Sequence, residues 1–125
     1  MIKKLSFITK ENPIEINIEN IKCLKINQLT TENITDVDVL ALSVNSNWRN
    51  IVVTDDQNAI TPIVKLIPKI RYKNIEEGYF YMEDSPLLSF NKGDEKIELS
   101  FYNVENFELV KFESNLILTI TYNQY

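Results

Sequence analysis

Paired carboxylates are the residues of this chain whose types and spacing best suit a catalytic or metal-binding site. The 125-residue sequence holds four adjacent acidic pairs, Asp55–Asp56, Glu76–Glu77, Glu83–Asp84 and Asp94–Glu95. Two carboxyl groups that face each other across a cleft hydrolyse glycosides, and several oxygens that converge on one point bind Ca²⁺. All four pairs lie in predicted turns, where acidic side chains favour solubility and hydrogen-bond their own backbone. We therefore interpret them as solvated turn residues, with calcium binding and catalysis as the alternatives.

The composition removes most other catalytic chemistry. The chain contains no histidine, a single cysteine at Cys23, and two glycines, Gly78 and Gly93. A Ser-His-Asp or Cys-His system therefore has no base, and a zinc or iron–sulfur site lacks ligands. Two widely separated glycines do not form a phosphate-binding loop. We expect no enzyme activity, no cofactor and no metal, and we interpret Cys23 as a buried, inert thiol.

Aromatic residues are the strongest candidates for binding. Trp48 precedes Arg49 in an asparagine-rich segment, where the pair suits a protein contact or sugar stacking; the alternative is an indole that covers the core. Tyr79–Met82 places aromatic rings on both faces of one expected strand, so the outer face needs cover or a partner. Tyr122 and Tyr125 raise the same question near the C-terminus. The candidate interface comprises Trp48, Arg49, Tyr79, Tyr81, Tyr122 and Tyr125.

Period-two alternation of apolar and polar residues recurs along the chain and predicts strands. It runs through Ile14–Ile18, Ile97–Phe101 and Leu116–Tyr122. The parity slips after Asn20, which predicts a turn or bulge there, because asparagine tolerates a positive φ. Val37–Val44 is nearly continuous in apolar residues, as expected for a strand that is covered on both faces.

Shorter apolar runs predict the remaining strands, at Ile21–Ile26, Ile51–Thr54, Ile60–Val64, Ile70–Ile75, Tyr79–Met82, Leu87–Phe90 and Phe107–Phe112. Asp55–Asn58 and Asn91–Asp94 separate neighbouring runs as hairpin turns, and Gly78 lies at or near another turn. Pro68 is expected to end the strand that precedes it, because proline cannot donate to a ladder.

The regular spacing of these strands predicts the fold class. About nine to eleven short strands, separated by turns, are typical of an all-β fold, an antiparallel β-sandwich of the jelly-roll or Ig-like type with little helix. Seventeen isoleucines against two alanines favour the same class, because β-branched residues suit a pleated surface and alanine suits a helix. The length fits one domain, residues 1-125.

Charge and hydropathy restrict the partners and the location. The net charge is −5 and the basic residues are scattered, which argues against nucleic acid. Met1–Ile8 has the two lysines of a signal peptide, but its apolar run is too short for one. No run approaches the ~18 apolar residues of a membrane span. We expect a soluble protein with no signal peptide or transmembrane segment, and with neither nucleic acid nor membrane as a partner.

An acidic, helix-poor domain with aromatic strand faces and no catalytic residues favours a structural role. We expect a non-enzymatic assembly protein that contacts other protein subunits of a larger assembly, and also its own copies as a homo-oligomer. The expected assembly is a bacteriophage virion, formed in the host cytoplasm, with this chain as an auxiliary or decoration subunit of the capsid or tail. Burial of apolar surface and strand addition at sheet edges would hold it there. The alternative is a carbohydrate-binding β-sandwich module that uses Trp48, Arg49 and Tyr79 or Tyr81.

Overall fold

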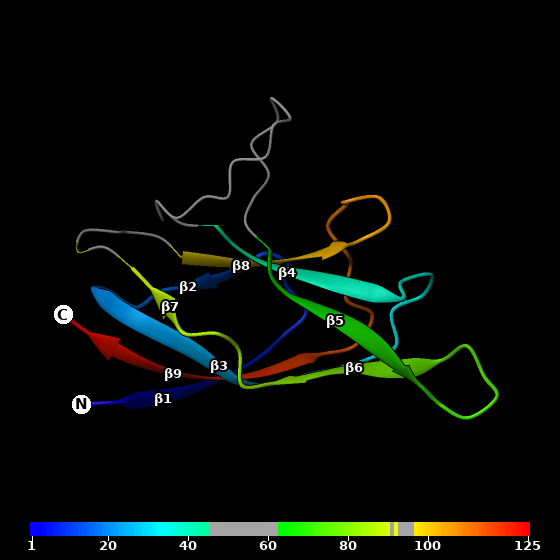
Figure 1. The fold of residues 1–125 in the computed structure, drawn as a ribbon, viewed down its shortest axis with the longest axis horizontal. Helices are drawn as coiled ribbons and strands as arrows, with labels where there is room; N and C mark the ends of the chain where they lie inside the picture. The colour runs from blue at the N-terminus through cyan, green and yellow to red at the C-terminus, as the bar shows by residue number, and fades with distance from the viewer. Residues whose placement is uncertain (46–62, 91, 93–96) are drawn as a thin grey trace.

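Strands account for all the regular structure in the part of the chain that the structure describes. The computed structural model describes residues 1–45, 63–90, 92 and 97–125 (Figure 1). Its strands are β1 (Lys3–Thr9), β2 (Ile14–Ile16), β3 (Ile21–Glu32), β4 (Val39–Asn45), β5 (Ile63–Arg71), β6 (Gly78–Glu83), β7 (Leu88–Ser89), β8 (Ile97–Asn103) and β9 (Leu116–Gln124). These residues contain no helix with the length and hydropathy needed to cross a membrane. The predicted all-β class is confirmed.

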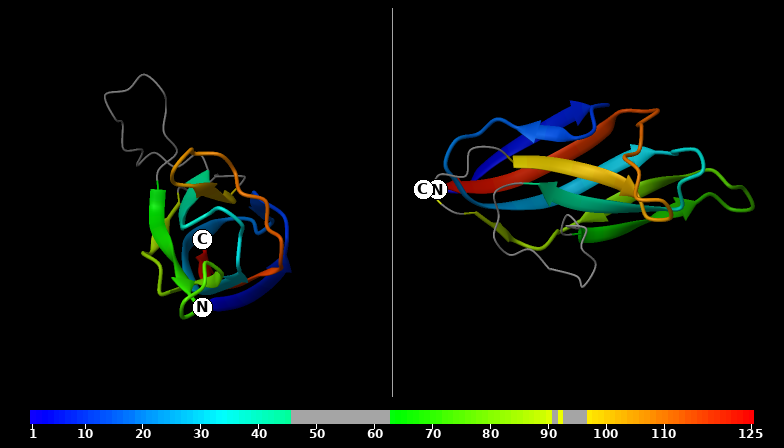
Figure 2. Two further views of the ribbon diagram at one scale, coloured as in Figure 1. Left: turned by 90° about the vertical axis from the view of Figure 1, so that its right-hand side faces the viewer. Right: turned by 90° about the horizontal axis from the view of Figure 1, so that it is seen from above.

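The strands form one curled sheet. Every pairing is antiparallel, in the order β1-β9-β3-β6-β5-β4-β8-β2, with β7 beside β3. Strand β5 belongs to both halves of the sheet, because residues 63–68 pair with β4 and residues 69–71 pair with β6. The result is a half-barrel, seen end-on in the left view of Figure 2. The predicted sandwich is not confirmed, since β5 joins what would be two separate sheets.

The core lies on the concave side of the curled sheet. Alternate residues of β6, β8 and β9 are buried there, as the period of two requires. The cover predicted on both faces of Val37–Val44 is observed over Leu40–Val44, which is buried at every position, but not at Asp38, which is exposed. The largest fully buried side chains are Phe80, Phe101, Leu24, Ile26, Leu29, Leu40, Leu42, Ile67, Leu99, Leu116, Leu118 and Ile120.

The change of parity predicted near Asn20 is confirmed. Asn20 has a φ of 56°, in the left-handed region that asparagine tolerates. The pairing of β3 with β9 then contains an irregularity between Ile21 and Cys23. Turn and bulge together return Leu24 and the residues after it to the core side.

Other predictions about strands are wrong. Met1–Ile8, which we did not expect to be a strand, supplies most of the edge strand β1. Phe107–Phe112 was predicted to be a strand, but it lies in the connection from β8 to β9, with only an isolated bridge between Tyr102 and Leu109. The predicted segments Ile51–Thr54, Asp55–Asn58, Ile60–Val64 and Asn91–Asp94 fall wholly or mostly outside the described residues.

One asparagine holds an end of the curled sheet together. Asn12 lies in the link that carries the chain from the edge strand β1 to the opposite edge strand β2. Its Nδ2 donates to the carbonyl oxygens of Phe101, at 2.9 Å, and Val110, at 2.7 Å. Its Oδ1 accepts from the Phe101 N–H at 3.1 Å. These bonds tie the link to β8 and to the loop that follows β8.

Replacing this asparagine should destabilise the fold. Asn12→Ala is expected to lower the free energy of unfolding by about 2–4 kcal/mol, because partly buried backbone groups lose their partner. Asn17→Ala, at an exposed asparagine just after β2, is the control and should change it by less than about 0.5 kcal/mol. Urea unfolding followed by circular dichroism measures both. Equal losses in the two variants would contradict the role of Asn12.

Candidate interface on strands β5 and β6

Strand β5 turns apolar side chains toward the solvent. Ile67 is buried in the core, so alternation puts Lys69 on the same inner side. The outer side carries Leu66 and Ile70, whose exposed fractions are 51% and 41%. A strand with ordinary patterning turns its apolar residues inward and its charged residues outward. The pattern of β5 is therefore inverted at the end that pairs with β6, where Lys69 lies inward and Ile70 outward.

Contacts at the open end of the half-barrel stabilise the inward lysine. The Nζ of Lys69 donates to the Ile34 carbonyl oxygen at 3.3 Å and lies 5.7 Å from the centroid of the Phe80 ring. An ammonium over an aromatic face is a favourable cation–π arrangement. Arg71, two residues further along β5, donates to Asp38 at 2.6 Å, and this hydrogen bond raises the pKa of Arg71. Both cations therefore have partners, and the outer side is left to apolar residues.

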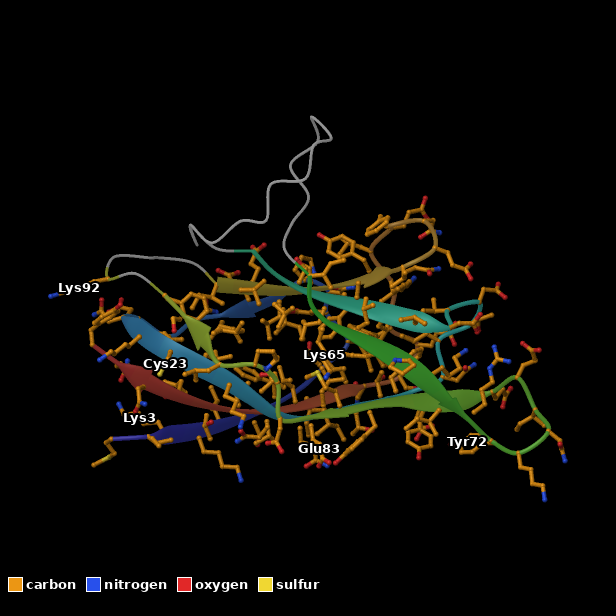
Figure 3. All side chains as sticks on the ribbon, viewed as in Figure 1. Lys3, Cys23, Lys65, Tyr72, Glu83 and Lys92 are labelled. Carbon is orange, nitrogen blue, oxygen red and sulfur yellow. The ribbon has the colours of Figure 1, made fainter. Side chains whose placement is uncertain are left out.

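Tyrosines extend this outer side across β6. Tyr79 and Tyr81 lie on the outer face, half-buried, while the residues that alternate with them are buried. Tyr79 pairs with Ile70 of β5, and its ring centroid lies 5.9 Å from that of Tyr72. In Figure 3 Tyr72 and Glu83 mark the two ends of this surface. We define the β5–β6 face as Leu66, Pro68, Ile70, Tyr72, Tyr79 and Tyr81.

The turn between the two strands fixes the position of the tyrosines. Tyr72 N–H donates to the Glu77 carbonyl oxygen at 2.9 Å, and Asn74 within the turn has a φ of 65°. Gly78 follows as the first residue of β6, so the prediction placed it correctly beside the turn. A Cβ at Gly78 would lie 2.1 Å from the Ile70 carbonyl oxygen. Only glycine lets the two strands approach this closely at the start of β6.

A groove opens where β5 and β6 separate. Pro68 lies inside β5, so the prediction that it ends a strand is wrong. The ladder between β5 and β6 ends at the pair Lys69–Phe80. The residue before Lys69 is Pro68, which has no N–H to donate to β6, so the pairing does not continue. The groove beyond has a volume of about 240 Å³. Its lining includes Lys65, Leu66, Pro68, Tyr81, Met82 and Glu83.

Carboxylates raise the pKa of two phenols of the face. Tyr81 Oη donates to Glu83 Oε2 at 3.0 Å, and this hydrogen bond raises the pKa of Tyr81. The negative charge of Glu32, whose Oε2 lies 3.4 Å from Tyr72 Oη, raises the pKa of Tyr72. Both hydroxyls thus lie beside carboxylates, and the rings present a combined apolar and hydrogen-bonding surface.

The remaining candidate aromatics do not join this face. Tyr122 lies on the inner side of β9 and packs against the core. Tyr125 is 52% exposed, and its hydroxyl donates to the Phe90 carbonyl oxygen at the end of the molecule where both termini lie (Figure 1). Trp48 and Arg49 fall outside the described residues. The structure thus brings Tyr79 and Tyr81 together, and separates them from Tyr122 and Tyr125.

Sequence reasoning missed Leu66, Ile70 and Tyr72. Apolar residues occupy both parities of the segment Ile63–Ile70, so alternation alone does not say which of them face outward. The missed signal is Lys69, which shares a parity with the buried Ile67. A cation on the core side of a strand leaves apolar residues for its other side.

The structure describes two of the four acidic pairs, and neither belongs to a metal-binding group. Glu76 and Glu77 line an open hollow of about 410 Å³ together with Asp36 and Asp38. Among the described residues, no group of three or more possible ligands is placed to hold a metal ion. Glu83 accepts the Tyr81 hydroxyl. Asp55–Asp56 and Asp94–Glu95 lie outside the described residues.

The sheet edges are the other surfaces on which a partner strand could add. Strand β1 pairs only with β9, and β2, which has three residues, pairs only with β8. Short edge strands and lysines protect a sheet from strand addition. Strand β1 carries Lys3 and Lys4, and Lys3 donates to Gln124 Oε1 at 2.6 Å. Both edges are thus protected, whereas the β5–β6 face is not.

Comparisons with protein-family models, with curated proteins and with solved structures find no match for this chain. Its function must therefore be argued from its own surfaces. Of those described, the β5–β6 face combines exposed aliphatic side chains, paired aromatic rings and a groove. Such a combination is typical of sites that bind another molecule.

The hydrogen bond at Tyr81 predicts a titration. Glu83→Leu should lower the pKa of Tyr81 toward the ordinary tyrosine value, whereas Glu105→Leu, at an exposed carboxylate of the loop after β8, should leave it unchanged. Tyrosine ¹³Cζ chemical shifts against pH measure this. Because the folded pKa is raised, the stabilisation is complete below the unfolded value, about 10, and is lost as pH rises through the folded value. Identical titrations in both variants would contradict the contact.

Proposed function

We propose that this protein is a non-enzymatic subunit that acts by contact with other proteins through its β5–β6 face. The proposal is supported chiefly by the inverted pattern of β5, whose outer side carries Leu66 and Ile70 half-exposed while lysine lies inward. Monomers rarely expose contiguous apolar surface, and larger patches mark contact sites. The neighbouring tyrosines suit such a contact, since aromatic residues are enriched in the buried centres of interfaces.

The particular assembly in this proposal is a bacteriophage virion. The chain would be an auxiliary or decoration subunit of the capsid or tail, with capsid or tail proteins as its partners. Its support is the sequence: an acidic, helix-poor composition without the residues of common catalytic or cofactor sites. A subunit of this kind needs a stable fold and an adhesive surface, and no turnover.

Variants of the face test the proposal. The purified chain is mixed with each protein encoded beside its own gene, and masses are measured by light scattering after size exclusion. We expect a complex of defined mass with at least one of them. Tyr81→Ser and Ile70→Ser should weaken that complex about tenfold or more, the effect of truncating a central interface residue. Thermal stability should change little, because both side chains lie on the outer face.

Ile8→Ser is the matched control, because Ile8 is 69% exposed on β1, away from the face. It should leave the complex unchanged. A chain that remains a monomer and binds none of these proteins would contradict the proposal. A Tyr81→Ser variant that loses much thermal stability but still forms the complex would contradict the proposed role of Tyr81 in the contact.

Carbohydrate binding is the second candidate function, and one observation favours it. Tyr72 and Tyr79 form a tilted ring pair, and Tyr72 is 44% exposed beside the carboxylate of Glu32. Sugars bind by stacking on such rings and by hydrogen bonding to nearby polar groups. Trp48 and Arg49, the other residues expected in a sugar site, fall outside the described residues.

Ring resonances distinguish the two functions. If the face contacts proteins, adding oligosaccharides should leave the NMR signals of Tyr72 and Tyr79 in place, and adding a protein partner should shift them. If it binds carbohydrate, an oligosaccharide shifts them, Tyr72→Ser abolishes binding, and Tyr125→Ser, at a similarly exposed ring elsewhere, does not. We expect the first result. A saturable shift with sugar alone would replace the protein-contact proposal.

A further inference from the structure

The turn after β8 holds a phenylalanine in a backbone conformation that suits glycine. Asn103 N–H donates to the Glu108 carbonyl oxygen at 2.9 Å, and Phe107 N–H donates to the Asn103 carbonyl oxygen at 2.8 Å. Phe107 has a φ of 56°, the left-handed region in which a bulky residue is an outlier. Its side chain is 58% exposed, so packing within the chain does not explain why it is there. Strain that is kept at an exposed position points to a function for the side chain.

The surroundings of Phe107 define what it fits. Leu109, two residues on, is 47% exposed and adds apolar surface. Glu105 and Glu108 lie in the same turn, where their backbone N–H groups donate to the side-chain oxygens of Asn103 and Asn106. The turn therefore carries an exposed aromatic ring and two acidic residues, of which Glu108 accepts a hydrogen bond from Asn106 Nδ2 at 3.5 Å. Its complement is an apolar recess with a cation at its rim.

The groove between β5 and β6 has these properties. Its volume of about 240 Å³ is too small for most small-molecule ligands, whose pockets hold about 300–1,000 Å³. It is large enough for a phenyl ring, because a cavity of about 150 Å³ accepts benzene. Its apolar lining comes from Leu66, Pro68 and Met82. Lys65 also lines the groove and has no ion-pair partner among the described residues. Glu83, its carboxylate, already accepts a hydrogen bond from Tyr81.

We propose that Phe107 of one copy of this chain inserts into the β5–β6 groove of a second copy. In Figure 1 the turn after β8 lies apart from strands β5 and β6, which border the groove, so one copy presents both turn and groove. The contact is heterologous, and its repetition produces rings or filaments. This inference rests on the proposed function, and it names the chain itself as a partner of the β5–β6 face.

A complementation experiment tests the contact with the full chain alone. Sedimentation velocity from micromolar to millimolar concentration should show the mass of the wild-type protein rising beyond a dimer. Phe107→Asn removes the ring and Leu66→Asp blocks the groove, so each variant alone should remain a monomer. Mixed in equal amounts, they should form dimers and nothing larger, because only one intact turn and one intact groove remain in each pair. Ile8→Asp, at an exposed isoleucine of β1, should associate like the wild type.

Two further readouts separate a binding role from a structural one. Phe107→Asn should raise Tm by about 3–5 °C, since asparagine tolerates the left-handed backbone, whereas a phenylalanine needed for folding would lower it. Added salt should weaken association, because Glu105 and Glu108 face Lys65 in the proposed contact. A wild-type chain that is monomeric at every concentration, or variants that associate like the wild type, would overturn the inference. The proposed function would survive either result, because it is judged by binding to other gene products.

Discussion

The structure depends on a change of pairing partner within strand β5, at Pro68. The Lys69 N–H donates to the Asp38 carbonyl oxygen, on the β4 side of the strand. Because the backbone groups of successive residues point to opposite sides of a strand, those of residue 68 point toward β6. A proline at that position has no N–H for the ladder with β6. Residues 63–68 of β5 therefore pair with β4 alone, and the pairing with β6 is confined to residues 69–71. This change of partner makes one curled sheet out of what would otherwise be two. It also opens the groove, so the curvature of the fold and its candidate site have the same origin.

The inverted polarity of β5 follows from its place at the open end of the half-barrel. An inward lysine is tolerated there because Lys69 reaches the Ile34 carbonyl oxygen and the face of Phe80. Deeper along the strand the inner side is apolar, at Ile67. The outer side then carries leucine and isoleucine with no charged residue between them, and the tyrosines of β6 extend it. Folding does not require this arrangement, since polar residues would suit an outer face equally well.

Much of the fold could be predicted from alternation, and the rest depends on contacts between distant segments. Leu116–Tyr122 and the slip at Asn20 are local patterns, and both predict the observed structure. Phe107–Phe112 has a similar pattern, but hydrogen bonds across the turn from Asn103 to Glu108 give it another conformation. Asn12 bonds to Phe101, 89 residues away, and no local pattern reveals this contact. The site follows the same rule: Tyr79 and Tyr81 were found as neighbours in sequence, whereas Leu66 joins them only through the pairing of strands.

The surfaces of this chain are protected unequally, and the inequality bears on the contact that we propose. Its edge strands carry the features that discourage strand addition, namely lysines on β1 and brevity of β2. The β5–β6 face has no such protection, and the turn at Phe107 keeps both strain and an exposed ring. Each of these lowers the stability of an isolated chain, and burial in a contact offsets both. The contact that we propose is therefore side-chain docking on a face rather than extension of the sheet.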